Sequence, residues 1–299
     1  MRKLSVFFVL AASAGAMLLP QIVAAQEQPK GAMPPPPVLV MLREEVKHGK
    51  QTAHDKNETA WTQALVHAKY PTSMYGLDSV TGPSEAIWLI GFPTFAAVEA
   101  DFKLQNSGVI EAINAQYGAQ EADDVSGDSE LIARHREDLS YGSPINIGEY
   151  RYMQIAVTRV RPGHNADYEE YLKTVNEARK ATNSTANIAV YQVTSGGFTG
   201  TFISFTPRKS LAEFDAPPNQ AMTDAMKPNQ EKVGQLIDKS VTSTNTAIYA
   251  FNPRMSNPSE AVAATDPSFW KPKAVMAAKS PASSSDDAAK KPASKKTNE

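Results

Sequence analysis

The chain has 299 residues and no cysteine, which excludes thiolate nucleophiles, cysteine-ligated zinc and iron–sulfur clusters. Its formal charge of −2 includes +4 from residues 271–299 and +2 from Arg2 and Lys3, so residues 26–270 carry −8. An acidic body repels phosphate backbones, and we expect no nucleic-acid partner.

Residues 1–25 have the pattern of a signal peptide. Arg2 and Lys3 precede an apolar run, and the small residues at its end suit cleavage after Ala25. A retained membrane anchor is the alternative, but a glycine and a proline interrupt the run and no charged flank follows it. We therefore expect an exported protein, periplasmic or secreted, without a stable membrane span after cleavage.

The next segment, residues 26–37 (QEQPKGAMPPPP), is polar and rich in proline. Such a composition favours an extended linker that does not pack on the body. Residues 38–143 then read as one folded unit, because apolar periodicity alternates there between short strands and helices. The expected order is strand 38–46, a helix whose buried stripe includes Trp61 and Leu65, hairpin strands 72–80 and 85–92, helices near 94–104 and 107–121, and strand 130–135.

Residues 144–257 repeat this plan as a second unit. The run at 150–160 has apolar residues on both faces, as a central strand does, and Asn165 is placed to cap the helix that follows. A hairpin, a broken helical region over 208–243 and a last strand at 246–251 complete the unit.

Three pairs of landmarks recur at nearly constant separation, which predicts an internal duplication. They are Gly49 and Gly163, 114 residues apart, Phe92 and Phe205, 113 apart, and Ser140 and Ser256, 116 apart.

Each unit therefore has the order β-α-β-β-α-β of a ferredoxin-like domain. A four-stranded sheet with helices on one face leaves its other face bare and apolar, and two such sheets can cover each other. The expected fold class is α+β, with two tandem ferredoxin-like units that form an intramolecular α+β barrel.

After the second unit, residues 258–299 are dominated by alanine, proline, serine and lysine. We expect a disordered tail, because this composition buries too little apolar surface to offset its ordering entropy. Phe269 and Trp270 form one apolar island that could dock on the body. The lysines suit a solvated tether or, alternatively, contact with an anionic surface.

The segment VTRVRPGHNADYEEYL, residues 157–172, resembles the first strand and helix entry of the dimeric α+β barrel superfamily. This superfamily includes antibiotic-biosynthesis-monooxygenase-like and NIPSNAP-like proteins, and the resemblance covers residues 38–256. It implies a pocket between helices and sheet in each half. The activities it implies range from cofactor-free oxygenation to haem chemistry, and some members have no assigned reaction.

Residue by residue, the resemblance does not support haem chemistry. Haem-degrading members place an Asn on the first strand, a Trp on the third and a His on the next helix, and only Trp88 matches here. Chlorite-dismutase-like members use an axial His in the second half, where His164 lies in a turn. We expect no cofactor. We also expect no metal site, because Glu44, Glu45, His48 and His54 match no standard ligand spacing.

The expected ligand pockets lie between sheet and helices, where strand ends and strand–helix turns supply polar groups. The candidate lining residues are Tyr75 and Trp88 in the first unit, Tyr191, Arg159 and His164 in the second, and His48 at the rim.

Two functions stay open. One is an exported small-molecule-handling protein that binds a small apolar or aromatic ligand or acts as a cofactor-independent oxygenase-like enzyme. The other is a non-catalytic envelope scaffold for protein contacts. The pocket that the superfamily resemblance implies in each half favours the first function, and the lack of a recognisable acid–base pair favours the second function. The sequence also leaves open whether the protein forms a homo-oligomer.

Overall fold

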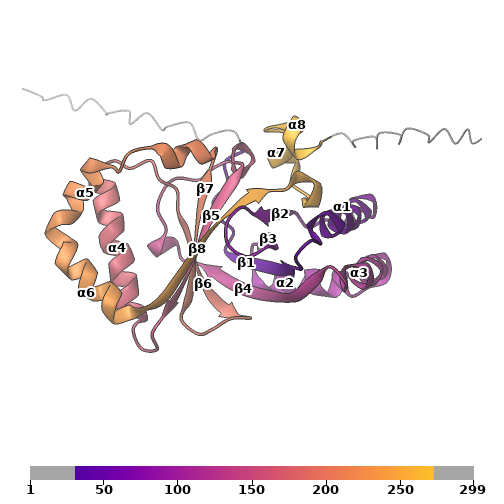
Figure 1. Ribbon diagram of the computed structural model, residues 1–299, viewed down its shortest axis with the longest axis horizontal. Coiled ribbons are helices and arrows are strands. Elements are labelled where there is room, and N and C mark those ends of the chain that lie inside the picture. The colour runs from indigo at the N-terminus through magenta and orange to yellow at the C-terminus, as the bar shows by residue number, and fades with distance from the viewer. Residues whose placement is uncertain (1–30, 273–299) are drawn as a thin grey trace, which may run out of the picture.

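The structure is a computed structural model that describes residues 31–272. Its strands close into one antiparallel barrel in the order β1-β3-β2-β8-β5-β7-β6-β4 (Figure 1). The strands are β1 (Val38–Val46), β2 (Met74–Ser79), β3 (Glu85–Phe92), β4 (Val125–His135), β5 (Tyr152–Val160), β6 (Ala189–Ser195), β7 (Thr201–Arg208) and β8 (Val241–Phe251).

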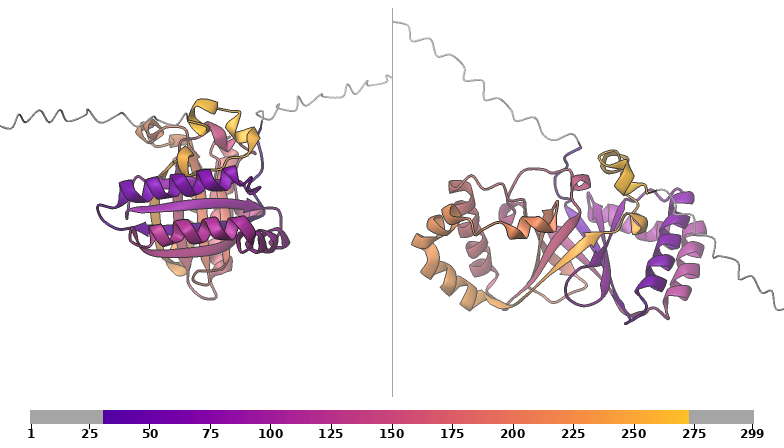
Figure 2. Two further views of the ribbon diagram at one scale, coloured as in Figure 1. Left: turned by 90° about the vertical axis from the view of Figure 1, so that its right-hand side faces the viewer. Right: turned by 45° about the horizontal axis from the view of Figure 1, so that its top comes forward.

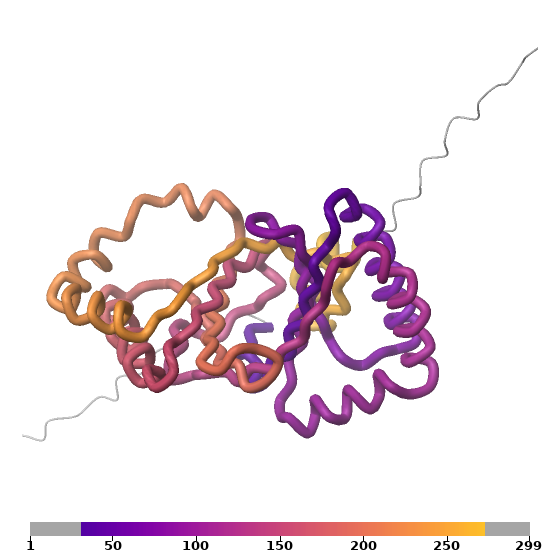
Figure 3. Tube along the Cα trace, turned by 60° about the horizontal axis from the view of Figure 1, so that its bottom comes forward, coloured from indigo at the N-terminus to yellow at the C-terminus, as the bar shows by residue number. Residues whose placement is uncertain are grey.

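Helices cover the barrel on two opposite sides, one side for each half of the chain (Figures 1 and 2). The tube in Figure 3 shows the two halves side by side. The first half carries α1 (Gln51–His67), α2 (Phe95–Gln105) and α3 (Gly108–Glu121), and the second carries α4 (Asn165–Ala181), α5 (Gln220–Met226) and α6 (Gln230–Ser240).

Within each half the strands follow the ferredoxin-like order, β4-β1-β3-β2 in the first unit and β8-β5-β7-β6 in the second. The predicted fold class is therefore confirmed. The halves are also joined through their sheet edges, because β2 pairs with β8 and β4 pairs with β6. Sheet closure leaves no strand edge of the barrel unpaired, which the stacking of two open sheets would not achieve.

Alternation along the strands divides the molecule into three apolar layers. In β1, Leu39 and Met41 face the barrel interior, while Val38 and Val40 face the helices of the first unit. The interior is filled by side chains of both halves, including Ile155 from β5. Two further layers lie between each sheet and its own helices.

The duplication is visible in local geometry. Gly49 and Gly163 have φ of 80° and 85°, and each lies two residues before the start of the first helix of its unit. Ser140 and Ser256 are equivalent too, because each Oγ accepts a backbone N–H from the first strand of a hairpin at 2.9 Å. The donors are Val190 in β6 and Gly76 in β2, respectively. These two landmark pairs correspond as predicted.

The third landmark pair is wrong. Phe92 pairs with Val38 and faces the helices, whereas Phe205 pairs with Ile155 and lies inside the barrel. The matching strands β3 and β7 begin 116 residues apart, at Glu85 and Thr201. The separation of 113 between the two phenylalanines is three less than the 116 between the strands. Because side chains alternate between the two faces of a strand, a difference of an odd number of residues places the side chain on the opposite face.

The tail does not start where the composition suggested. Residues 258–272 are folded and include α7 (Glu260–Ala263) and α8 (Pro267–Trp270), which lie over one end of the barrel (Figure 2). Trp270 is 2% exposed, and its indole N–H donates to the carbonyl of Gly148 at 2.9 Å. Burial of this large side chain, together with Val262 and Ala263, explains why the segment is ordered.

The segment before β1 also packs on the body. Met33 forms a bridge with Ile145, and the carbonyl of Pro36 accepts the hydroxyl of Tyr191 at 2.9 Å. Residues 31–37 are thus no free linker. The predicted signal peptide and the rest of both ends, residues 1–30 and 273–299, lie outside the described residues. Between residues 31 and 272, none of the helices combines the length and apolarity needed to cross a membrane.

Candidate functional site

The helix–sheet layer of the first unit contains four ionisable side chains that meet in the protein interior. Glu44 comes from β1, His54 and Glu58 from successive turns of α1, and Glu121 from the end of α3. One potential ligand atom from each residue lies within 4.8 Å of the others. His54 is fully buried and Glu58 is 3% exposed. We call these four residues the histidine–carboxylate cluster.

His54 is at the centre of the cluster. Its Nε2 lies 2.9 Å from Glu44 Oε2 and 3.7 Å from Glu121 Oε1. Glu58 accepts a hydrogen bond from the amide of Asn57 at 3.2 Å, and the same amide donates to the carbonyl of Tyr117 on α3. These bonds fix α1 against α3 and hold the carboxylates at short range.

The cluster holds three carboxylates close together where little water reaches them, and this arrangement shifts pKa values within it. Burial and the charge of Glu44 raise the pKa of Glu58 to about 7. Burial, a hydrogen bond to Glu44 and the charge of Glu58 also raise the pKa of Glu121. Burial alone would lower the pKa of His54, but its carboxylate neighbours Asp55 and Glu44 raise it to about 10. Without another cation, the cluster must therefore hold protons near neutral pH.

Two polar atoms of the cluster have no hydrogen-bond partner. They are Nδ1 of His54 and Oε1 of Glu121, and both are buried. Buried polar atoms without partners are uncommon in native proteins and call for an explanation, such as an ion or a water molecule.

The second unit has no such cluster at the matching positions. Helices α1 and α4 begin 114 residues apart, and strands β4 and β8 begin 116 residues apart. Applied to the cluster, these offsets lead to Thr158, Tyr168, Leu172 and Ile237. Tyr168 packs on Phe202 with ring centroids 4.9 Å apart, so an aromatic pair replaces the buried ion pair.

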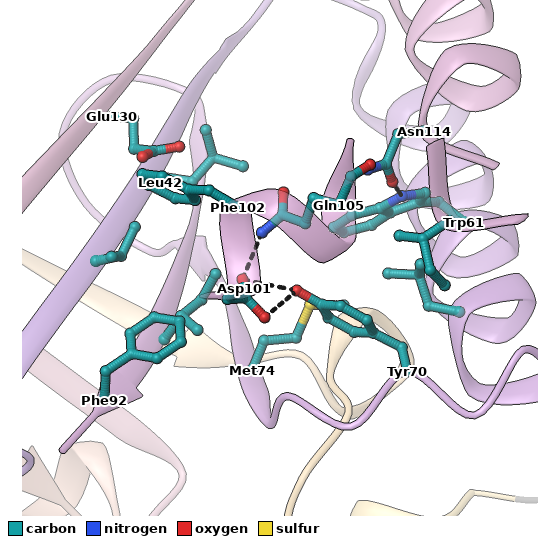
Figure 4. A pocket seen from close by; sticks show the side chains of 14 residues that line it. Leu42, Trp61, Tyr70, Met74, Phe92, Asp101, Phe102, Gln105, Asn114 and Glu130 are labelled. Atoms are coloured by element: carbon teal, nitrogen blue, oxygen red, sulfur yellow. Dashed lines mark hydrogen bonds between the residues drawn. The ribbon is translucent and has the colours of Figure 1, made fainter. Parts of the chain in front are cut away.

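A small cavity lies further along the same layer of the first unit. Its volume is about 60 Å³, well below the ~150 Å³ of an apolar cavity that admits a benzene ring. Most of its lining is apolar, and Figure 4 shows the few polar groups. They are Tyr70, Asp101, Gln105, Asn114 and Glu130.

The polar groups of the cavity are mostly engaged with one another. Tyr70 and Gln105 both donate to Asp101, at 2.8 and 2.7 Å, and Asn114 accepts the indole N–H of Trp61 at 3.0 Å (Figure 4). The cavity therefore suits one or a few water molecules or a ligand of very few atoms.

Two tryptophans separate the cavity from the cluster. Trp61 lines the cavity and meets Trp88 edge-on at 6.1 Å, and Trp88 lies 6.3 Å from the ring of His54. Trp88 is fully buried and donates its indole N–H to the carbonyl of Met255 at 3.1 Å. Of the six predicted pocket residues, Trp88 alone borders the cluster, and none lines the cavity.

The other predicted residues of the sheet lie inside the barrel instead of the helix–sheet layer. Tyr75 packs edge-on against Trp270 and Phe251, and Tyr191 packs edge-on against Phe205. Inward-facing positions of the strands explain this placement.

The remaining three predicted residues, at a strand end and in the turns before helices, are separated from one another. Arg159 stacks its guanidinium over Phe198, 3.9 Å from the ring centroid, and His164 bonds to Asp167 at 2.8 Å. His48 is exposed before α1. A role for these residues in ligand binding stays a prediction.

The sequence did carry a signal for the cluster. His54 and Glu58 lie four residues apart and continue the stripe of Trp61 and Leu65 along α1, so they share its buried face. Glu44 shares the helix-facing side of β1 with Val40. The expectation of no metal site rested on the spacing of four residues near His48. The structure keeps only Glu44 and His54 of that set and adds Glu58 and Glu121.

No family model matches the sequence, and neither does any curated protein. Solved structures of similar fold include an anthrone oxidase-like protein, with 14% identity and a TM-score of 0.49 over 72% of this chain and 91% of that chain. Another is a chlorite dismutase from Candidatus Nitrospira defluvii in complex with imidazole, with 9% identity and a TM-score of 0.45 over 73% of this chain and 92% of that chain. At these identities the similarity concerns the fold.

Proposed function

We propose that this protein is an exported metal-binding protein that holds one divalent cation in the histidine–carboxylate cluster. The observation that carries the proposal is the convergence of Glu44, His54, Glu58 and Glu121 within 4.8 Å in the interior of the first unit. Three carboxylates and one imidazole place up to three negative charges there. A divalent cation neutralises most of that charge and gives the unpaired oxygen of Glu121 a partner.

The donor set indicates the class of ion. Calcium and magnesium prefer all-oxygen sites of higher coordination number or with retained water, whereas imidazole suits first-row transition ions. Mixed imidazole and carboxylate donors therefore favour manganese, ferrous iron or zinc. Four protein donors complete a tetrahedral shell, which is typical of structural zinc sites, while catalytic sites keep a position open.

Metal binding keeps the ligand handling of the first function expected from the sequence and, like the second, requires no catalysis. The 60 Å³ cavity is too small for the apolar or aromatic ligand that we expected, and an open groove of about 600 Å³ between α1 and the C-terminal segment is lined mainly by polar side chains, so metal binding is the better supported form of ligand handling. Export rests on the signal-peptide pattern of residues 1–25. An oxidising compartment is compatible with this site, because it uses no thiolate.

Metal content measured on the mature protein tests the proposal. We expect one zinc or manganese ion per chain after incubation with the metal salt and gel filtration, and none with Glu58→Ala. The matched control is Leu172→Ala, at the equivalent position of α4, which should keep the ion. Wild-type protein that retains less than a tenth of an equivalent of every first-row divalent ion would refute the assignment.

A further inference from the structure

We propose that Asp55 is a positioning residue of the metal site, the outer carboxylate that orients His54 and strengthens its bond to the cation. This inference rests on the proposed function. It adds a residue that does not touch the ion and that the ligand set alone would not reveal.

The geometry begins with the two nitrogens of the His54 ring. Nε2 points toward Glu44 and Glu121, at 2.9 and 3.7 Å. Nδ1, on the other side of the ring, is buried and has no hydrogen-bond partner. The carboxylate oxygen nearest to it in the structure is Oδ1 of Asp55, at 3.8 Å. A closure of about 1 Å makes this contact a hydrogen bond.

The contact between Nδ1 and Asp55 determines which ring nitrogen of His54 carries the proton. If Nδ1 carries the proton toward Asp55, Nε2 presents its lone pair to the cluster, which is the form that binds a metal ion. A negative charge beside Nδ1–H also makes Nε2 a stronger donor. Ligating histidines in metalloproteins commonly have such an outer carboxylate, and its loss typically costs 10–100-fold in metal affinity.

Asp55 is itself held in place by a short chain of hydrogen bonds. Gln51 donates to Asp55 Oδ1 at 3.0 Å, and Ser84, in the loop between β2 and β3, donates to Gln51 Oε1 at 3.0 Å. The chain fixes the carboxylate on the side of α1 next to His54. Because Gln51 donates to the same oxygen that approaches Nδ1, the carboxylate cannot turn away without losing a bond.

Asp55 also differs from the ligands in its access to solvent. Its side chain is 42% exposed, and it lines an open groove of about 600 Å³ between α1 and the C-terminal segment, together with Lys56, Arg254 and Phe269. In Figure 1 this segment, with α7 and α8, lies close to α1. A substitution of Asp55 therefore removes, besides its approach to His54, only the part-buried hydrogen bond from Gln51, and the melting temperature separates a functional effect from a folding defect.

The experiment measures zinc affinity of the mature protein by competition with a chromophoric chelator. We expect affinity to fall about tenfold in Asp55→Asn and up to about 100-fold in Asp55→Ala, with partial recovery in Asp55→Glu. The cobalt(II) d–d absorption of Asp55→Asn should shift, because His54 loses its orientation. The unfolding midpoint in chelator should stay within about two degrees of wild type, which a purely structural role would not predict.

Two controls remove a carboxylate elsewhere. Glu169→Gln acts at the position of α4 that matches Asp55, and Glu45→Gln acts beside Glu44 but on the other face of β1, where Arg43 holds it at 3.0 Å. Both should bind zinc as wild type does.

Wild-type zinc binding combined with an Asp55→Ala affinity within twofold of it overturns this inference and leaves the proposed function standing. A wild-type chain that binds neither zinc nor cobalt overturns the proposed function and this inference with it. An equal loss in Glu45→Gln shows a general charge effect and overturns the positioning role.

Discussion

The two helix–sheet layers have the same backbone plan and opposite chemistry. In the first unit the layer holds His54, Glu58 and their carboxylate neighbours, and in the second it holds Tyr168 and Leu172 at the matching positions of α4. The turns before α1 and α4 agree in detail, since Gly49 and Gly163 share the left-handed conformation. The fold therefore does not require the ionisable groups.

That difference is informative because buried charge is expensive. A pair or triad of buried ions is commonly no more stable than an apolar replacement of the same volume, so stability alone does not account for four such groups. An apolar core at these positions is available in the same molecule, in the second unit. The presence of buried ionisable side chains in only one half therefore indicates that they have a function other than stabilising the fold.

The largest expected effect is stabilisation by the metal. Zinc or manganese at 1,000 times its Kd should stabilise the wild-type protein by about 4 kcal/mol. His54→Phe should abolish the shift in melting temperature, and Tyr168→Phe, its counterpart in the second unit, should retain it. A melting temperature of His54→Phe that still rises with metal would break the proposed division between the layers.

A reciprocal swap at Glu58 and Leu172 should change stability in opposite directions when a chelator is present. At pH 8, Glu58→Leu should stabilise by roughly 1–3 kcal/mol and Leu172→Glu should destabilise by about 2–4 kcal/mol, both read from urea unfolding. Leu172→Glu should gain no metal binding, because Thr158, Tyr168 and Ile237 supply no comparable donor set.

The sign of the pH dependence follows from the pKa of Glu58, which burial and Glu44 raise from 4.5 to about 7. The unfolded chain loses this proton first as pH rises. The penalty of Glu58 is therefore absent below pH 4.5, grows between pH 4.5 and 7, and is constant above. The advantage of Glu58→Leu should shrink accordingly on acidification, and an advantage that grows instead would contradict this account.

Where the halves agree in contacts, matched substitutions should cost the same. Ser140 and Ser256 each accept a strand N–H at 2.9 Å and donate to a carbonyl, at 2.8 and 2.7 Å. Ser140 Oγ also lies 3.0 Å from Nε2 of His135, a contact that Ser256 lacks. In a His135→Phe background, which removes the extra contact, Ser140→Ala and Ser256→Ala should each destabilise by about 1–2 kcal/mol and differ by less than about 0.5 kcal/mol. Chemical unfolding of both variants at one pH provides the comparison, and a twofold difference would show that the repeat is less regular than the geometry indicates.

The smallest effect is expected at His135, which matches Phe251 in the second unit. Burial lowers the pKa of His135 below its ordinary value of 6.5. Protonation then favours the unfolded chain, so this residue costs stability as pH falls below 6.5. His135→Phe should reduce the loss of stability between pH 7 and 5 by a few tenths of a kcal/mol. Thermal melts across that range would detect an unchanged slope, which would exclude His135 as a contributor.

The architecture was predictable because the same order of strands and helices is repeated in the two halves of the sequence. Glycine turns, helix entries and hairpins recur at a separation near 114, and repetition makes each weak local signal stronger. The error at Phe92 and Phe205 shows the limit of this reasoning. A hairpin can differ in length between repeats, and the sequence does not show where the extra residues enter.

The site was harder to predict, because its residues meet only through tertiary packing. Glu121 lies 77 residues after Glu44 and joins it through the docking of α3 on the sheet. Motif spacing describes sites built on one element, and this one uses a strand and two helices. Amino-acid composition did not predict that residues 258–272 are folded, for a related reason. Three buried side chains, Trp270, Val262 and Ala263, outweigh the unfavourable composition of the rest of the segment.

The closed barrel of a single chain has a consequence for how such a site can arise. If two identical chains built the barrel, every substitution would enter both layers, and a buried carboxylate would be desolvated at two places at once. Here each half is encoded separately, so one layer can accept costly groups while the other keeps the whole molecule folded. Fusion of the two units thus frees one half to specialise and leaves the other as its structural support.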